Sequence, residues 1–143
     1  MYIVAFAMAF GRVMALMGVP QMANDLVSSI FDSTIGILFI MVLIMFVLGM
    51  FMEVVSALLI IAPIFVPIAT SAGVDPIHFG VIMIVALSTG FVTPPVGLNL
   101  YVASGMSGIG IIPMSKKLYP MIGVFFIDVI LVVCVPWFSL ALL

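Results

Sequence analysis

The sequence predicts an all-α, polytopic membrane protein. Of its 143 residues, 67% are apolar and only 6% are charged, whereas a soluble domain carries about a quarter charged residues. Uncharged, largely apolar stretches occupy residues 54–74 and 79–115, and a helix needs about 20 apolar residues to cross a bilayer. These stretches do not alternate between apolar and polar positions as the strands of a membrane barrel do, so helices are expected.

The composition also excludes several classes of function. Three basic residues cannot neutralise a phosphate backbone, so no nucleic-acid partner is expected. The single Cys134 excludes an internal disulfide, and the single His78 excludes a histidine-cluster metal site. The motifs of serine hydrolases, zinc proteases, P-loop NTPases and dinucleotide-binding proteins are missing from the sequence, so an enzyme is not expected.

Residues 1–33 predict part of a membrane helix followed by an amphipathic helix. Residues 1–17 are apolar apart from Arg12, and Gly18 and Pro20 mark the end of this stretch. The first residues carry no polar segment, which fits a chain that begins within a helix and also fits a short first span. Residues 21–33 place apolar side chains at helical spacing beside acidic ones, as in a helix at a membrane surface, and the acidic face is expected to be solvated.

Residues 34–73 predict a hairpin of two apolar arms that meet near Glu53. Two full crossings with a turn need slightly more residues, and Pro63 and Pro67 are expected to interrupt the second arm. A re-entrant hairpin fits this length, and so do two short crossings with Glu53 in an aqueous loop. Glu53 is expected near the turn, facing protein or water, because a charged side chain in lipid costs about 2.5–3.5 kcal/mol. The alternative is a protonated Glu53 at a packed helix contact.

Residues 74–115 predict a discontinuous transmembrane helix and a connector. Asp75 followed by Pro76 is typical of a helix start. The Thr-Pro-Pro-Val-Gly sequence of residues 93–97 then interrupts the apolar stretch, and two consecutive prolines cannot lie inside a regular helix. Carbonyl groups are therefore expected to lose their helical partners near the middle of the membrane. A glycine-rich connector follows at residues 105–113.

Residues 116–143 predict the last transmembrane helix. Asp128 lies about 15 Å along this helix from Lys117, at 1.5 Å per residue, so it is expected to pair with a group inside the helix bundle. Lys116 and Lys117 form the only basic pair, and positive charge beside a span favours the cytoplasmic side. By alternation, Asp75 and the open end of the hairpin are expected outside.

The predicted break has the chemistry of a cation site. Secondary transporters bind ions where broken helices expose carbonyl oxygens, and sodium suits carbonyl and hydroxyl ligands. Thr93 supplies a hydroxyl, Gly90 allows close backbone approach one turn earlier, and Asn99 adds an amide one turn after Val96. Ser88 and Thr89 add hydroxyls, although such groups often bond a carbonyl four residues back. A kinked helix without a ligand is the alternative that the residues alone leave open.

Four sequence blocks together resemble the large membrane subunit of tripartite ATP-independent periplasmic (TRAP) transporters. They are Gly-Met-Phe-Met-Glu at 49–53, Ile-Ile-Ala-Pro-Ile at 60–64, Gly-Val-Asp-Pro-Ile-His-Phe-Gly at 73–80 and Gly-Phe-Val-Thr-Pro-Pro-Val-Gly-Leu-Asn-Leu at 90–100. The likeness extends over nearly the whole chain, and the last two blocks in this order are highly specific. The family's subunit is longer than this chain. The resemblance therefore implies its C-terminal portion, which is the second half of an inverted-repeat ion-transporter fold.

The resemblance also implies a function. It implies the C-terminal part of the membrane permease of a sodium-coupled, elevator-type importer of small organic acids in the bacterial inner membrane. A sodium (Na+) site is implied at Gly49, Gly90, Thr93 and Val96, and the candidates for substrate binding are Ser56 and Asn99. The implied partners are a periplasmic solute-binding protein, a small membrane subunit, the missing N-terminal half of the large subunit and an organic acid anion. A non-transporting helical scaffold or interaction fragment is the alternative from another class, and a related anion transporter of the same superfamily is the third.

Overall fold

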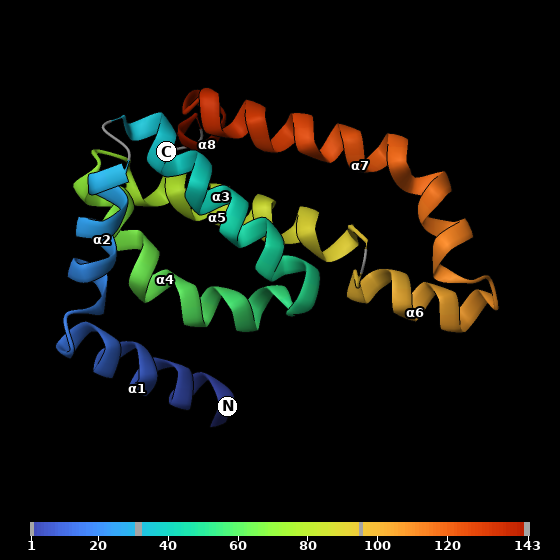
Figure 1. The fold of residues 1–143 in the computed structure, drawn as a ribbon, viewed down its shortest axis with the longest axis horizontal. Helices are drawn as coiled ribbons and strands as arrows, with labels where there is room; N and C mark the ends of the chain where they lie inside the picture. The colour runs from blue at the N-terminus through green and yellow to red at the C-terminus, as the bar shows by residue number, and fades with distance from the viewer. Residues whose placement is uncertain (1, 31–32, 95, 142–143) are drawn as a thin grey trace.

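The computed structural model describes residues 2–30, 33–94 and 96–141, and these form eight helices and no strands. Figure 1 shows them in chain order: α1 (Tyr2–Leu16), α2 (Val19–Ile30), α3 (Thr34–Phe51), α4 (Val54–Ser71), α5 (Pro76–Val92), α6 (Leu98–Ser107), α7 (Ile111–Cys134) and α8 (Trp137–Leu140). Residues 31–32 of the predicted amphipathic helix and Pro95 of the predicted break lie outside the described residues. The described part of the chain confirms the all-α prediction.

Among the described residues, three helices, α3, α4 and α7, are long and apolar enough to cross a membrane. The pair formed by α1 and α2 is a fourth candidate, although its two parts are bent by 65° about a break at Gly18, whose φ is +72°. The chain is therefore a polytopic membrane protein by the length and composition of its helices.

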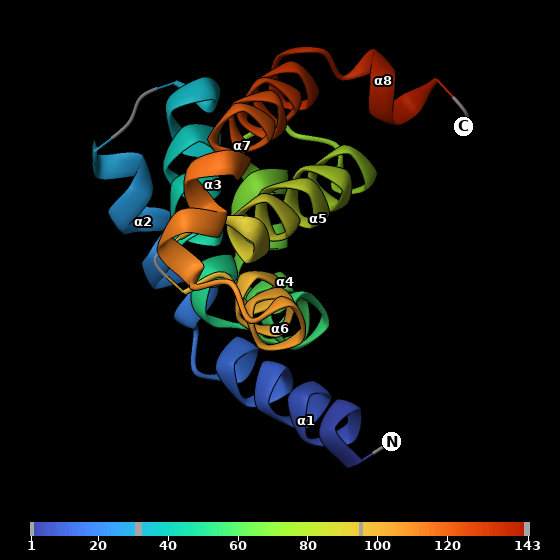
Figure 2. The same ribbon diagram turned by 90° about the vertical axis from the view of Figure 1, so that its right-hand side faces the viewer.

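The helices are stacked in layers around α5. In Figures 1 and 2, α1 lies against α4, α3 and α5 form the centre, and α7 covers them from the opposite side. The largest fully buried side chains belong mainly to the two central helices, and they include Met41 and Met45 of α3 with Phe79, Met83 and Leu87 of α5. The contact between α3 and α5 therefore dominates the core and positions the break at the end of α5.

The two arms α3 and α4 form a hairpin whose open end is fastened by side chains. Thr34 Oγ1 donates a hydrogen bond to the Ala72 carbonyl at 3.0 Å, which joins the start of one arm to the end of the other. Ser71 Oγ donates to Asn24 Oδ1 at 2.7 Å and ties the same end to α2. These contacts hold the two arms and the amphipathic helix together at one end of the molecule.

The expectation that Pro63 and Pro67 interrupt the second arm is wrong, because α4 is continuous from Val54 to Ser71 with both prolines inside it. Membrane helices tolerate proline where neighbouring helices cover the disturbed backbone. Here the ring of Pro63 packs against α1 at Gly11, where an added Cβ would lie only 2.8 Å from Pro63 Cγ. The proline thus takes part in the contact between the two helices.

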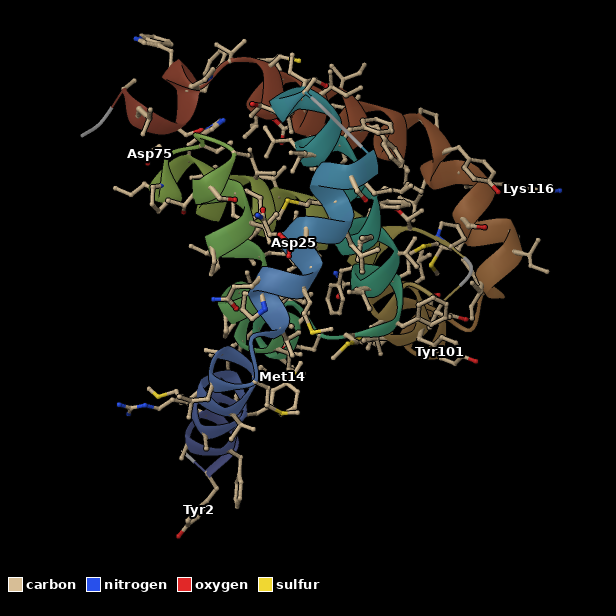
Figure 3. All side chains as sticks on the ribbon, turned by 60° about the vertical axis from the view of Figure 1, so that its left-hand side comes forward. Tyr2, Met14, Asp25, Asp75, Tyr101 and Lys116 are labelled. Carbon is tan, nitrogen blue, oxygen red and sulfur yellow. The ribbon has the colours of Figure 1, made fainter. Side chains whose placement is uncertain are left out.

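The last long helix begins and ends earlier than the sequence suggested. It starts at Ile111, within the predicted connector, because Pro113 falls in the first turn, where a missing N–H costs no helical hydrogen bond. It ends at Cys134, shortly before Pro136, and α8 follows. Lys116 therefore lies within α7, and Figure 3 shows it at the opposite end of the molecule from Asp75.

Candidate functional site

The broken helix is the most distinctive feature of the chain. The first half, α5, begins at Pro76, where Asp75 Oδ1 accepts the N–H groups of Ile77 (2.8 Å) and His78 (3.3 Å). It ends at Val92, and Thr93 follows with extended backbone. The second half, α6, begins at Leu98, so the helix is interrupted between Val92 and Leu98 (Figure 1).

Hydrogen bonds at the end of α5 differ from the sequence expectation. Because Pro94 lacks an N–H group, the Gly90 carbonyl cannot receive its regular helical bond. It accepts the N–H of Thr93 at 2.9 Å instead, so this carbonyl is not left without a partner. A carbonyl oxygen has two lone pairs, and the second remains available to a cation.

The Thr93 side chain bonds back to its own helix. Its Oγ1 donates to the Thr89 carbonyl at 2.7 Å, which fixes the position of the hydroxyl proton. The lone pairs of Oγ1 then point away from this donor bond and can accept a cation. Thr89 itself donates to the Val85 carbonyl at 2.8 Å, so its hydroxyl has a structural partner in α5.

The backbones of α3 and α5 meet at two glycines. A Cβ atom on Gly90 would overlap the Phe46 carbonyl oxygen and would lie 3.0 Å from the Cα atom of Gly49. A Cβ atom on Gly49 would overlap the Leu87 carbonyl oxygen and would lie 3.0 Å from the Cα atom of Leu87. Only glycine permits this approach, and it brings the hairpin arm against the last turn of α5.

These groups suit a sodium ion. The structure brings Gly49 into contact with Gly90 and joins Gly90 to Thr93 by a hydrogen bond, while Val96 is half-buried within the break. The oxygens that these four residues can offer are backbone carbonyls and the Thr93 hydroxyl, which are the kinds of ligand that broken transporter helices offer to sodium. The carboxyl end of α5 also carries the negative end of the helix dipole, which favours a cation.

The candidates for substrate binding occupy the first turns of two other helices. Ser56 lies in the first turn of α4, where its N–H and its hydroxyl both donate to Glu53 Oε2, at 2.9 and 3.0 Å. Glu53 Oε1 accepts the Val55 N–H at 2.9 Å, so this exposed carboxylate caps α4 at the hairpin turn. Asn99 is exposed in the first turn of α6, and among the described residues no hydrogen bond joins it to Ser56.

Three residues at the site escaped the sequence analysis. Phe46 and Leu87 contribute through their carbonyl groups at the glycine crossing, and an apolar side chain gives no signal that the carbonyl of its residue faces another helix. Phe46 also places its ring against Phe126 of α7, with 4.8 Å between the ring centroids. Gly97 adopts a φ of +43°, and its place directly after Pro-Pro-Val was the available signal.

Comparison with known proteins gives consistent results. Residues 1–138 match the model of the family described as "Tripartite ATP-independent periplasmic transporter, DctM component". The chain is 40% identical to the C4-dicarboxylate TRAP transporter large permease protein DctM of Vibrio cholerae, over 97% of this chain and 31% of that protein. It is 40% identical to the isethionate TRAP transporter permease protein DctMQ of Oleidesulfovibrio alaskensis, over 95% of this chain and 22% of that protein.

A third relative carries a different substrate name. The chain is 37% identical to the sialic acid TRAP transporter large permease protein SiaM of Vibrio cholerae, over 93% of this chain and 31% of that protein. The chain thus spans about a third of the length of the two large permeases, and it matches a fragment of such a subunit. The family is a transporter component and not an enzyme family. With a family match over residues 1–138, the chain belongs to the DctM component of the TRAP transporters.

Proposed function

We propose that the chain forms the C-terminal part of the membrane permease of a sodium-coupled importer of small organic acids. The observation that carries this proposal is the glycine crossing beside the broken helix, where Gly49, Gly90 and Thr93 come together. The family belongs to the bacterial inner membrane, and three helices of membrane-spanning length agree with that location.

Sodium coupling is supported by the fact that the proposed ligands come from two different structural elements. Gly49 belongs to the hairpin, whereas Gly90, Thr93 and Val96 belong to the broken helix or its break. An ion bound by carbonyls of both elements stabilises the arrangement in which they are in contact. Binding of the ion therefore favours closure of the hairpin against the broken helix, and an elevator-type movement then carries the closed unit across the membrane.

A small organic anion is the proposed substrate class. The relatives are named for a C4-dicarboxylate, isethionate and sialic acid, and these three molecules are organic acids. Ser56 and Asn99 are the proposed contacts. Asn99 lies in the first turn of α6, which has no side-chain cap and where N–H groups favour an anion. The N–H and hydroxyl of Ser56 donate to Glu53, so Ser56 takes the anion in place of that carboxylate. The proposed partners are a periplasmic solute-binding protein, a small membrane subunit and the N-terminal half of the permease.

The proposed orientation follows from charge. Lys116 and Lys117 lie near the start of α7 and favour the cytoplasm. Asp75 lies at the opposite end of the molecule (Figure 3), which corresponds to the periplasmic side. The fastened end of the hairpin, at Thr34 and Ala72, belongs to the same side as Asp75.

Thermal unfolding of the purified chain in detergent tests sodium binding. Unfolding is followed in NaCl and in KCl at equal ionic strength. We expect sodium alone to raise the Tm, because a ligand at about 100 times its Kd stabilises the folded state by about 2.7 kcal/mol. Equal Tm values in the two salts over the whole concentration range contradict the proposal and favour a helical scaffold without an ion site.

A further inference from the structure

Gly97 joins the two halves of the broken helix in a left-handed conformation that favours glycine. Its φ is +43° and its ψ is 87°, in the left-handed region that residues with a Cβ atom rarely adopt. Its carbonyl accepts the N–H groups of Leu100 at 2.7 Å and Tyr101 at 3.2 Å. Gly97 thereby forms the first turn of α6 and determines the direction in which α6 leaves the break.

Gly97 also packs directly against Thr93. An added Cβ atom would lie 3.0 Å from the Thr93 carbonyl oxygen and 3.0 Å from Leu100 Cδ1. The Leu100 side chain can adopt another rotamer, whereas the Thr93 carbonyl can move only together with the main chain of the break. Gly97 is buried, so a methyl group at this position requires the Thr93 carbonyl to shift by a few tenths of an ångström.

Two hydrogen bonds link Thr93 to carbonyl groups of α5, so a movement of Thr93 also affects the other oxygens of the site. The Thr93 N–H is bonded to the Gly90 carbonyl, and the Thr93 hydroxyl is bonded to the Thr89 carbonyl. A shift of the Thr93 main chain therefore moves its hydroxyl relative to the Gly90 carbonyl. Ion affinity is sensitive to such movements, because ligand oxygens must converge on one point at fixed distances.

We propose that Gly97 is a positioning residue for sodium: it provides no ligand, but its lack of a Cβ atom leaves room for the Thr93 carbonyl and so keeps the Thr93 and Gly90 oxygens at the spacing that the ion requires. This inference rests on the proposed function, since it concerns the same sodium site. It assigns to the glycine of the Pro-Pro-Val-Gly sequence a role in ion affinity in addition to its role as the start of α6.

The test measures the sodium concentration at half-maximal stabilisation of the purified 143-residue chain. Thermal unfolding is recorded over a series of NaCl concentrations, with KCl added to keep the ionic strength constant. We expect G97A to raise this midpoint about 10- to 100-fold, the range typical when a residue that orients metal ligands is lost. The wild-type chain measured in parallel tests sodium binding itself.

Two other glycines provide matched controls for backbone strain. Gly73 and Gly108 also have positive φ values, +83° and +69°, but an added Cβ atom meets nothing within 4 Å at either position. We expect G73A and G108A to lower the Tm in sodium-free buffer and to leave the sodium midpoint unchanged. An equal shift of the midpoint in these variants overturns the proposal, because strain alone then explains the effect.

A second variant covers the case in which G97A does not fold. Asparagine tolerates positive φ better than alanine, yet its Cβ atom still faces the Thr93 carbonyl, so G97N is expected to raise the midpoint as well. A wild-type midpoint in G97A or G97N overturns the positioning role and leaves the sodium site intact. A wild-type chain that sodium does not stabilise overturns the proposed function, and the inference about Gly97 fails with it.

Discussion

Gly49 of α3 and Gly90 of α5 lie against each other with no side chain between them. The Cβ position of Gly90 is 3.0 Å from the Cα and carbonyl carbon atoms of Gly49. Gly49 also faces the Leu87 carbonyl of α5, and Gly90 faces the Phe46 carbonyl of α3. This arrangement allows Cα–H···O contacts between the two helices. The hairpin and the broken helix therefore meet through their main chains, directly beside the last turn of α5.

Alanine at either glycine is expected to separate the two helices. A methyl group on Gly90 has only backbone atoms in front of it, so α3 and α5 must move apart, and overpacking of this kind costs about 1–3 kcal/mol. We expect G90A and G49A to lower the Tm of the purified chain and to abolish its dependence on sodium. Thermal unfolding in NaCl and KCl measures both effects.

Gly80 offers the matched control in the same helix. An added Cβ atom there meets nothing within 4 Å, and alanine is a better helix former than glycine by about 0.5–1 kcal/mol. G80A should therefore keep or raise the Tm and keep the response to sodium. If G80A lowers the Tm and the sodium response as much as G90A does, the close contact between α3 and α5 is not the cause of these losses.

The sequence predicted the local features of this region well. Asp75 with Pro76 predicted the start of α5, and residues 93–97 predicted its interruption, because proline and helix capping act on neighbouring residues. The hydrogen-bond partner of the Gly90 carbonyl could not be predicted from the sequence. The Thr93 N–H reaches it only because the chain tightens before Pro94, which is a detail of backbone geometry.

Contacts between distant residues could not be derived from spacing. The sequence marked Gly49 only through the resemblance to a family, because an apolar helix gives no signal for which face meets a neighbour. His78 Nδ1 lies 2.7 Å from Ser139 Oγ, although the two residues are far apart in the chain. The crossing of Gly11 with Pro63 belongs to the same class, since it depends on how α1 lies against α4.

Glu53 is expected to stabilise the hairpin as a helix cap. Its two carboxylate oxygens accept the N–H groups of Val55 and Ser56 separately, and the loss of such a cap costs about 0.5–2 kcal/mol. We expect E53A to lower the free energy of unfolding by this amount. E53Q should have an intermediate effect, because its amide keeps one acceptor oxygen and places N–H donors where the second stood.

The variant S56A separates the cap from the hydroxyl contact. It removes the hydrogen bond from Ser56 Oγ to Glu53 Oε2 but leaves both backbone bonds. Denaturant unfolding should show a smaller loss for S56A than for E53A. Equal stability of E53A and the wild type means that water replaces the carboxylate at this helix end without cost.

Asp128 is expected to pair with a group of the complete permease outside this chain. It is exposed on α7, about 15 Å from Lys117, near the middle of a hydrocarbon core about 30 Å thick. In the complete permease, D128N should lower stability by about 3–5 kcal/mol, since it leaves a buried partner charge unpaired. In the isolated chain the same substitution should not lower the Tm, because that partner is missing. Equal effects in both proteins contradict the pairing.

The Thr93 hydroxyl provides the sharpest test of the sodium site. Its lone pairs remain free while its proton is bonded to the Thr89 carbonyl, so T93V removes a ligand oxygen and keeps the shape of the side chain. The loss of a residue that only orients metal ligands typically lowers metal affinity about 10- to 100-fold, and the loss of a ligand oxygen is expected to have at least as large an effect. We therefore expect the sodium midpoint for stabilisation of the chain, and for uptake by the complete transporter, to rise at least about tenfold at nearly normal expression.

Two threonine variants show whether the oxygen itself is responsible. T93S keeps a hydroxyl at the same position and should restore most of the sodium affinity. T89V removes a hydroxyl that also bonds a carbonyl four residues back, that of Val85 at 2.8 Å, and it should leave the sodium midpoint unchanged. If T93V binds sodium as tightly as the wild type, the Thr93 oxygen is not a ligand, and the two prolines serve only to bend the helix. If T93V and T89V weaken binding equally, the cause is the loss of a helix-stabilising hydroxyl, because only Thr93 lies at the break.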